Sequence, residues 1–227
     1  MFSRNVILAV ITNFLVFGLL LLAPAGAWGW GRAWVLLSLI VAGTAVTMLG
    51  VFRHDEALLR ERMKSPFQKD QPLTDKIAVA LLLLSFFATL ILTPLDVFRF
   101  HLLPAPPLLI SWLGLFLFAF SWVIITLTFK ANTFAAPVVK HQTERHHAVI
   151  DHGVYAVVRH PMYIGTILFL FGMTLWLGST AAALLCFVPT LILAVRITFE
   201  ERFLRQHLPG YIAYTERVRY RLVPGLW

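Results

Sequence analysis

Long apolar runs separated by short polar segments divide the chain from one end to the other. Most runs approach the roughly 20 residues that a helix needs to cross a bilayer, whereas the fifth has only about 15. The fifth run joins the sixth at Gly178-Ser179, which predicts a tight hairpin. We predict an all-α, polytopic membrane protein with about six hydrophobic helices. The runs are Asn5–Ala23, Ala33–Phe52, Ile77–Leu95, Leu108–Phe129, Tyr163–Leu177 and Thr180–Phe199.

Composition supports this class of protein. Hydrophobic residues make up 59% of the chain and charged residues 13%, and the mean hydropathy is +0.80, far from the balance of a soluble domain. The first run is longer than the apolar core of a secretory signal, so we interpret it as a span. The single cysteine, Cys186, excludes an internal disulfide and a two-cysteine redox motif.

The basic residues are distributed unevenly among the loops. Loops 53–76 and 130–162 and the tail after residue 200 carry most of the lysines and arginines, whereas loops 24–32 and 96–107 carry one arginine each. With six spans, the positive-inside rule places all the basic regions and both termini in the cytoplasm. The net charge of +8 then fits an anionic leaflet, and no pattern indicates nucleic-acid binding.

A polar segment, 153–165, lies between two apolar runs. Gly153 permits a turn, Pro161 suits the first turn of the next helix, and Arg159-His160 directly precede that helix. An anion bound there would meet free backbone N–H groups, a positive helix end and a guanidinium. The alternative is that Arg159 and His160 only anchor a span at the interface. The histidines of this region lack metal-ligand spacing, so we predict no metal site.

A second transition begins one turn inside the sixth apolar run, at Arg196. Arg196 and Glu200 are four residues apart, so on a helix they share a face and an i,i+4 pair between them is one possible arrangement. A charge inside an apolar region is costly and therefore a candidate for function. The alternative is that Arg196 snorkels to the head groups with Glu200 as its structural partner. The absence of charges deep in the other spans argues against a transporter.

Three blocks of sequence resemble the integral-membrane methyltransferases typified by isoprenylcysteine carboxyl methyltransferase, with phospholipid N-methyltransferases as more distant relatives. The first block is 55–62 followed by Asp75-Lys76. The second runs from Asn132 to Gly165 around Arg159-His160-Pro161-x-Tyr163, and the third runs from 200 to 224. The chain departs from the bacterial pattern at Ala135-Ala136, which replace small hydroxyl residues, and at His146, which replaces a glycine.

The resemblance implies a cytoplasmic pocket for S-adenosylmethionine, formed by segment 140–165 and the C-terminal region. It divides the chain into N-terminal transmembrane helices (1–129, with cytoplasmic loop 53–76) and a catalytic region (130–227). Arg196 and Arg159 are the expected acceptor-binding residues, and Arg196, Glu200 and Glu201 the expected catalytic ones. The residues expected to contact the cofactor are Lys140, His147, Ala148, Val149, Ile150, Tyr155, His160, Pro161, Met162, Tyr163 and Glu200.

The predicted reaction is methyl transfer to an amphiphilic acceptor, a membrane lipid or a lipidated small molecule, in a bacterial inner membrane. A carboxylate acceptor is favoured, because methyl transfer to it needs positioning and desolvation but no general base. A phospholipid amine or a hydrophobic thiol is an alternative. An amine would need a base or an aromatic cage, for which Glu201, Tyr155 and Tyr163 are candidates. The non-enzyme alternative is a membrane scaffold that binds the cofactor.

Overall fold

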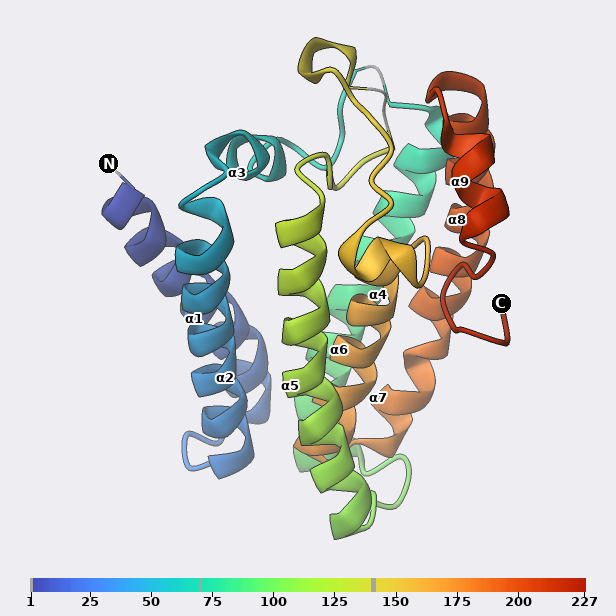
Figure 1. Cartoon of the computed structure of the whole chain (residues 1–227). Helices are drawn as coiled ribbons and strands as arrows, with labels where there is room; N and C mark the ends of the chain where they lie inside the picture. The colour runs from blue at the N-terminus through green and yellow to red at the C-terminus, as the bar shows by residue number, and fades with distance from the viewer. Residues whose placement is uncertain (1, 70, 140–141) are drawn as a thin grey trace.

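The computed structural model describes residues 2–69, 71–139 and 142–227, and every regular element in these ranges is a helix (Figure 1). The helices run roughly side by side, with α1 and α2 on one flank, α5 in front, and α6, α7 and α8 on the other flank (Figure 1). The long helices are α1 (Phe2–Ala25), α2 (Gly31–Thr47), α4 (Leu73–Leu95), α5 (Leu108–Ala131), α6 (Pro161–Leu177) and α8 (Phe187–His207). The short elements are η1 (Met48–Phe52), α3 (Glu56–Arg62), η2 (Asp96–Phe100), η3 (Thr143–Arg145), η4 (Gly153–Ala156), α7 (Thr180–Leu185) and α9 (Tyr211–Arg217).

The predicted spans are confirmed. Five helical segments of the described chain are long and apolar enough to cross a membrane: Asn5–Ala25, Gly31–Phe52, Leu73–Phe100, Leu108–Ala131 and Thr180–His207. The sixth apolar helix, α6, has 17 residues and is the short one that the sequence indicated. The hairpin that follows it forms because Gly178 adopts φ 98°, and because the Ser179 hydroxyl accepts a hydrogen bond from the Ala182 N–H at 2.9 Å.

The third span extends past its predicted end at Leu95. The sequence suggested a loop from Asp96 onward, but the helix continues through η2 to Phe100. It can do so because the buried Asp96 carboxylate is fully engaged: Ser179 Oγ donates to it at 2.6 Å and the Leu102 N–H at 2.7 Å. Such partners remove the penalty for burying the carboxylate at this end of the bundle.

The main core joins elements from both predicted regions of the chain. Leu21, Leu36, Phe118, Met173 and Cys186 all belong to one buried cluster. Helices α5 and α6 approach most closely where glycines face each other. A Cβ on Gly172 would lie 2.5 Å from the backbone nitrogen of Phe118 and 2.7 Å from the carbonyl oxygen of Gly114.

We expect Gly172→Ala to separate α5 from α6, because the added methyl group meets backbone atoms that cannot rotate away. The expected loss of stability is about 1–3 kcal/mol, typical of overpacking, measured as a lower unfolding midpoint in detergent. Gly50→Ala is the matched control, since a Cβ there would meet nothing within 4 Å. Equal midpoints for the two variants would show that α5 and α6 are not held at this distance.

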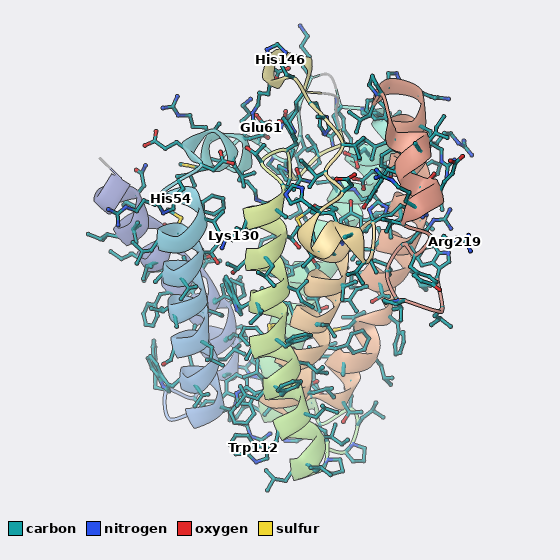
Figure 2. The ribbon with its side chains drawn as sticks, in the orientation of Figure 1. His54, Glu61, Trp112, Lys130, His146 and Arg219 are labelled. Carbon is teal, nitrogen blue, oxygen red and sulfur yellow. The ribbon has the colours of Figure 1, made fainter. Side chains whose placement is uncertain are left out.

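Polar loops and short helices gather at one end of the bundle. In Figure 2, Glu61, Lys130 and His146 lie toward this end, whereas Trp112 lies at the opposite end. Helix α3, the connection between α5 and α6, and α9 are all found here (Figure 1). This polar end therefore brings together the three sequence blocks singled out above.

Candidate functional site

A cavity opens at the polar end and encloses about 800 Å³, including its mouth. Its walls come from the connection between α5 and α6, the first turn of α6, the last turns of α8, and α9. The lining residues are Asn132, Phe134, Ala135, Ala136, Val138, Val139, Gln142, His147, Ala148, Val149, Ile150, Tyr155, Arg159, His160, Met162, Tyr163, Glu200, Leu204, Leu208, Tyr211 and Tyr214.

Backbone geometry explains how the α5–α6 connection folds over the cavity. Gly153 adopts φ 60° where η4 begins, and Pro161 is the first residue of α6, as predicted. His146 has φ 51°, a left-handed conformation that glycine adopts without steric cost. His146 therefore adopts the left-handed backbone conformation that favours glycine, the residue that it replaces in the family pattern.

Most of the predicted cofactor-contacting residues lie around this one cavity. Pro161 is the exception among the described ones, since it starts α6 without lining the cavity. Lys140 lies outside the described residues. The predicted residues that do line the cavity are His147, Ala148, Val149, Ile150, Tyr155, His160, Met162, Tyr163 and Glu200.

Glu200 supplies a carboxylate to the cavity wall. The Tyr163 hydroxyl donates to Glu200 Oε2 at 2.5 Å, and His160 Nδ1 lies 4.0 Å from the same oxygen. The rings of His160 and Tyr163 stack, with centroids 5.4 Å apart. The Glu200 side chain is 22% exposed. One carboxylate oxygen is thus held by the α6 side chains, which fixes the direction in which Glu200 faces the cavity.

Glu201, expected among the catalytic groups, has a different place. It does not line the cavity, and its side chain is only 4% exposed. Its Oε1 accepts from Arg159 Nε at 2.7 Å and lies 3.3 Å from His160 Nε2. Its Oε2 accepts from Arg221 Nε at 3.1 Å. With three neighbouring groups engaged, Glu201 positions Arg159, His160 and Arg221 beside the cavity.

Arg159 is likewise occupied. Besides Glu201, its Nη1 donates to the carbonyl oxygens of Val218 at 2.7 Å and Arg219 at 2.8 Å. The backbone N–H groups of Arg159 and His160 donate to the carbonyls of Tyr220 and Arg221 at 3.0 and 2.9 Å. The backbone N–H groups of these two residues are therefore engaged by the chain after α9.

Arg196 does not pair with Glu200 as the spacing suggested. Its Nε donates to Asp75 Oδ1 at 2.8 Å and its Nη2 to the Pro137 carbonyl at 3.0 Å. The Asp75 carboxylate also accepts from the Val139 N–H at 2.9 Å. Arg196 lines a second cavity of about 710 Å³ beside the first, and Val139 and Glu200 border both. The pair thus ties α4 to α8 and to the segment that forms the cavity wall.

Several tyrosines line the cavity as neutral phenols. Asn132 Nδ2 donates to the Tyr155 hydroxyl at 3.0 Å, and the Tyr214 hydroxyl donates to the Tyr155 carbonyl at 2.8 Å. Burial raises the pKa of Tyr155, Tyr211 and Tyr214 above the usual value for a phenol. These hydroxyls therefore stay protonated at neutral pH. A tyrosine must be ionised to act as a general base, so these tyrosines are not available for that role.

Sequence reasoning assigned no role to several lining residues, including Asn132, Gln142, Tyr211 and Tyr214. All four lie within the sequence blocks that carry the family resemblance. Gln142 is almost fully buried, donates to the Phe134 carbonyl at 2.8 Å and accepts from Arg145 Nη1 at 2.6 Å. Their position within these blocks was the one feature of the sequence that pointed to a role in the site. Their contacts could not be predicted, because these depend on the tertiary fold.

Residues 109–209 match the model of a protein family described as phospholipid methyltransferase. Two relatives from Arabidopsis thaliana, protein-S-isoprenylcysteine O-methyltransferases A and B, are 35% and 33% identical to the chain over 82 residues. The matched part is 35% of this chain, and the chain spans 42% of the length of each relative. The described residues include five helices that are long and apolar enough to cross a membrane, and the chain is an integral membrane protein. Residues 109–209 are thus similar to the phospholipid methyltransferase family, and the predicted resemblance to the membrane methyltransferases is confirmed for this part of the chain.

Proposed function

We propose that the protein is an S-adenosylmethionine-dependent methyltransferase that acts on an amphiphilic acceptor from the bilayer, with a carboxylate as the methylated group. One observation carries the proposal: side chains expected to contact the cofactor, from His147 to Glu200, surround a single cavity. The family match over 109–209 covers most of that wall. The two relatives are named isoprenylcysteine O-methyltransferases, which favours a carboxylate acceptor.

The chemistry of the cavity fits this cofactor. Glu200 offers an acceptor for hydroxyl or ammonium groups, Tyr155 and Tyr163 present aromatic rings suited to a cationic sulfonium, and Val149 and Ile150 provide apolar surface. When bound, the cofactor supplies an electrophilic methyl group for an in-line displacement. These contacts orient the two reactants and keep water away from them.

The residues around the reacting groups act by positioning. Tyr163 and His160 fix Glu200 from α6, while Glu201 holds Arg159 and the chain after α9 against the start of that helix. A carboxylate acceptor is already a nucleophile at neutral pH, so no proton has to be removed from it. This agrees with tyrosines that burial keeps protonated.

We further propose that the polar end faces the cytoplasm, where the positive-inside rule places its lysines and arginines. The acceptor is then a membrane lipid or a lipidated small molecule that approaches from the apolar side. A second candidate reaction is methylation of a phospholipid amine, favoured by the description of the matching family. A hydrophobic thiol and a scaffold that binds the cofactor without turnover are the remaining alternatives.

Calorimetric titration of the detergent-purified protein with S-adenosylhomocysteine tests the cofactor site. We expect saturable binding, weakened about 10- to 100-fold in Glu200→Gln, since hydrogen bonds to a charged group are lost. His160→Ala should also weaken binding, because His160 lines the cavity and stacks on Tyr163.

Glu216→Gln, at an exposed position of α9, is the control and should bind like the wild type. Unchanged affinity in Glu200→Gln would remove Glu200 from the cofactor site. Absence of binding to well-folded wild-type protein would contradict the proposed function. Binding without methyl transfer to any membrane lipid extract would support the scaffold.

A further inference from the structure

The segment after α9, residues 218–227, turns back along the bundle. Its Leu222 is buried in one cluster with Leu193 and Ile197, and Leu82 packs against the same cluster. Leu193 and Ile197 belong to the sixth apolar run and Leu82 to the third. The segment therefore extends from the polar end to the level at which the apolar spans begin.

Main-chain hydrogen bonds close residues 221–227 into a compact loop. A main-chain oxygen of Trp227 accepts from the N–H groups of Arg221, Leu222 and Val223 at 2.9, 2.9 and 3.2 Å. The Val223 carbonyl accepts from the N–H groups of Leu226 and Trp227, both at 3.1 Å. These bonds satisfy backbone groups that would otherwise be costly to bring near lipid.

Exposed apolar side chains lie on this loop, next in sequence to an exposed arginine. Leu226 is 81% exposed and Val223 48%, and Tyr220 just before the loop is also exposed. Arg219 is exposed and forms no ion pair with a carboxylate of the described residues. In Figure 2, Arg219 lies on the flank of the bundle at about the height of Lys130, which follows the fourth apolar run. An arginine beside exposed apolar side chains at this level is typical of a membrane interface.

Burial of Leu222 alone does not explain these side chains. A loop that only covered the Leu193 and Ile197 cluster would need no apolar residues on its outer side, whereas this loop exposes Leu226 and Val223. An apolar protein partner would match these two side chains but not Arg219. An anionic bilayer surface matches both, because acyl chains cover the apolar side chains and lipid phosphates attract the guanidinium.

We propose that the 221–227 loop and Arg219 form a docking surface for the anionic leaflet of the bilayer. Leu226 and Val223 enter the upper part of the acyl chains, and Arg219 binds the phosphates of negatively charged phospholipids. The ligand is the lipid head group as part of the membrane surface. The loop is thus a second contact with the bilayer, separate from the membrane-spanning helices.

Docking also bears on the cavity, a consequence that rests on the proposed function. The main-chain carbonyls of residues 218–221 accept hydrogen bonds from Arg159 and His160, and both of these residues line the cavity. A bilayer that holds the loop in place therefore favours this arrangement of the wall. By linkage, anionic lipid should raise the affinity for S-adenosylhomocysteine, by no more than the factor by which it stabilises the loop.

Hydrogen exchange of the protein in nanodiscs tests the docking surface, with phosphatidylcholine discs compared with discs that also contain phosphatidylglycerol. The hydrogen-bonded amides of the loop exchange when it opens. We expect exchange about 5-fold slower in the anionic discs, the contribution of one arginine near such a surface. Arg219→Gln should remove this difference and Arg219→Lys should keep most of it. Leu226→Gln should speed exchange in both kinds of disc.

Arg205→Gln is the matched control, since Arg205 is exposed on the last turn of α8, and it should exchange like the wild type. Equal exchange in the two kinds of disc, or a difference retained in Arg219→Gln, would overturn the proposal. Unchanged exchange in Leu226→Gln would contradict it as well. So would equal protection in phosphatidylcholine discs on addition of glycerol phosphate, because a soluble anion would then suffice. Exchange is measured without cofactor, so a failure to bind S-adenosylhomocysteine counts against the proposed function alone.

Discussion

Replacing Glu201 with alanine is expected to abolish binding of S-adenosylhomocysteine and to free the segment 218–221. The carboxylate contacts Arg159, His160 and Arg221 at 2.7, 3.3 and 3.1 Å. Its removal leaves the nearly buried Arg159 without its counter-ion, and breaking a buried pair in this way costs about 3–5 kcal/mol. The Arg159 side chain would then no longer be held toward the Val218 and Arg219 carbonyls.

Limited trypsin digestion provides the measurement, because cleavage after Arg219 and Arg221 requires that this segment leave the site. We expect rapid cleavage there in Glu201→Ala and slower cleavage in Glu201→Gln, which keeps one acceptor oxygen. Glu56→Gln is the control, since the Glu56 side chain is 62% exposed and pairs with Arg60 on the same helix. Wild-type protection in Glu201→Ala would show that the backbone pairing at Arg159 and His160 suffices without the carboxylate.

Arg196→Met should destabilise the protein by about 3–5 kcal/mol, the usual effect of removing one partner from a buried ion pair. The Asp75 carboxylate, 4% exposed, would keep only the hydrogen bonds from Gln71 Nε2 at 2.6 Å and the Val139 N–H at 2.9 Å. Loss of the pair would also loosen the cavity wall at Val139. The measurement is the unfolding midpoint in detergent, together with affinity for S-adenosylhomocysteine.

A double-mutant cycle separates the pair from its surroundings. Asp75→Asn in the Arg196→Met background should restore part of the lost stability, because the unpaired buried charge disappears. The exposed pair of Arg217 and Asp151, with side chains 65% and 42% exposed, is the control, and Arg217→Met should change stability by less than about 1 kcal/mol. If Arg196→Met leaves stability intact and impairs only methyl transfer, Arg196 would be an acceptor-binding residue after all.

The local features of the fold could be predicted from the sequence. Runs of apolar residues predicted the number and approximate bounds of the helices, because a helix that crosses a bilayer must be both long and hydrophobic. Gly178 and Pro161 marked a turn and a helix start through their backbone restrictions. The end of the third span was missed because Asp96 looks like a loop residue until Ser179 is brought beside it.

The partners of the charged residues could not be predicted in the same way. Helical spacing favoured Glu200 as the partner of Arg196, but Asp75, far away in the sequence, takes that place. Spacing identifies neighbours on one helix and says nothing of a carboxylate on another. For the same reason, Arg62 belonged to a matching block without any indication that it would reach Met162 across the site.

The pairing of Asp75 with Arg196 also sets an order of events in biosynthesis. The two residues are separated by 121 positions, so at 5–20 residues per second the ribosome needs roughly 6–24 s to pass from one to the other. During that interval α4 must enter the bilayer while its acidic first turn stays hydrated at the surface. The part of the cavity wall that Val139 forms is therefore fixed to α4 and α8 only after Arg196 has been synthesised, long after α4.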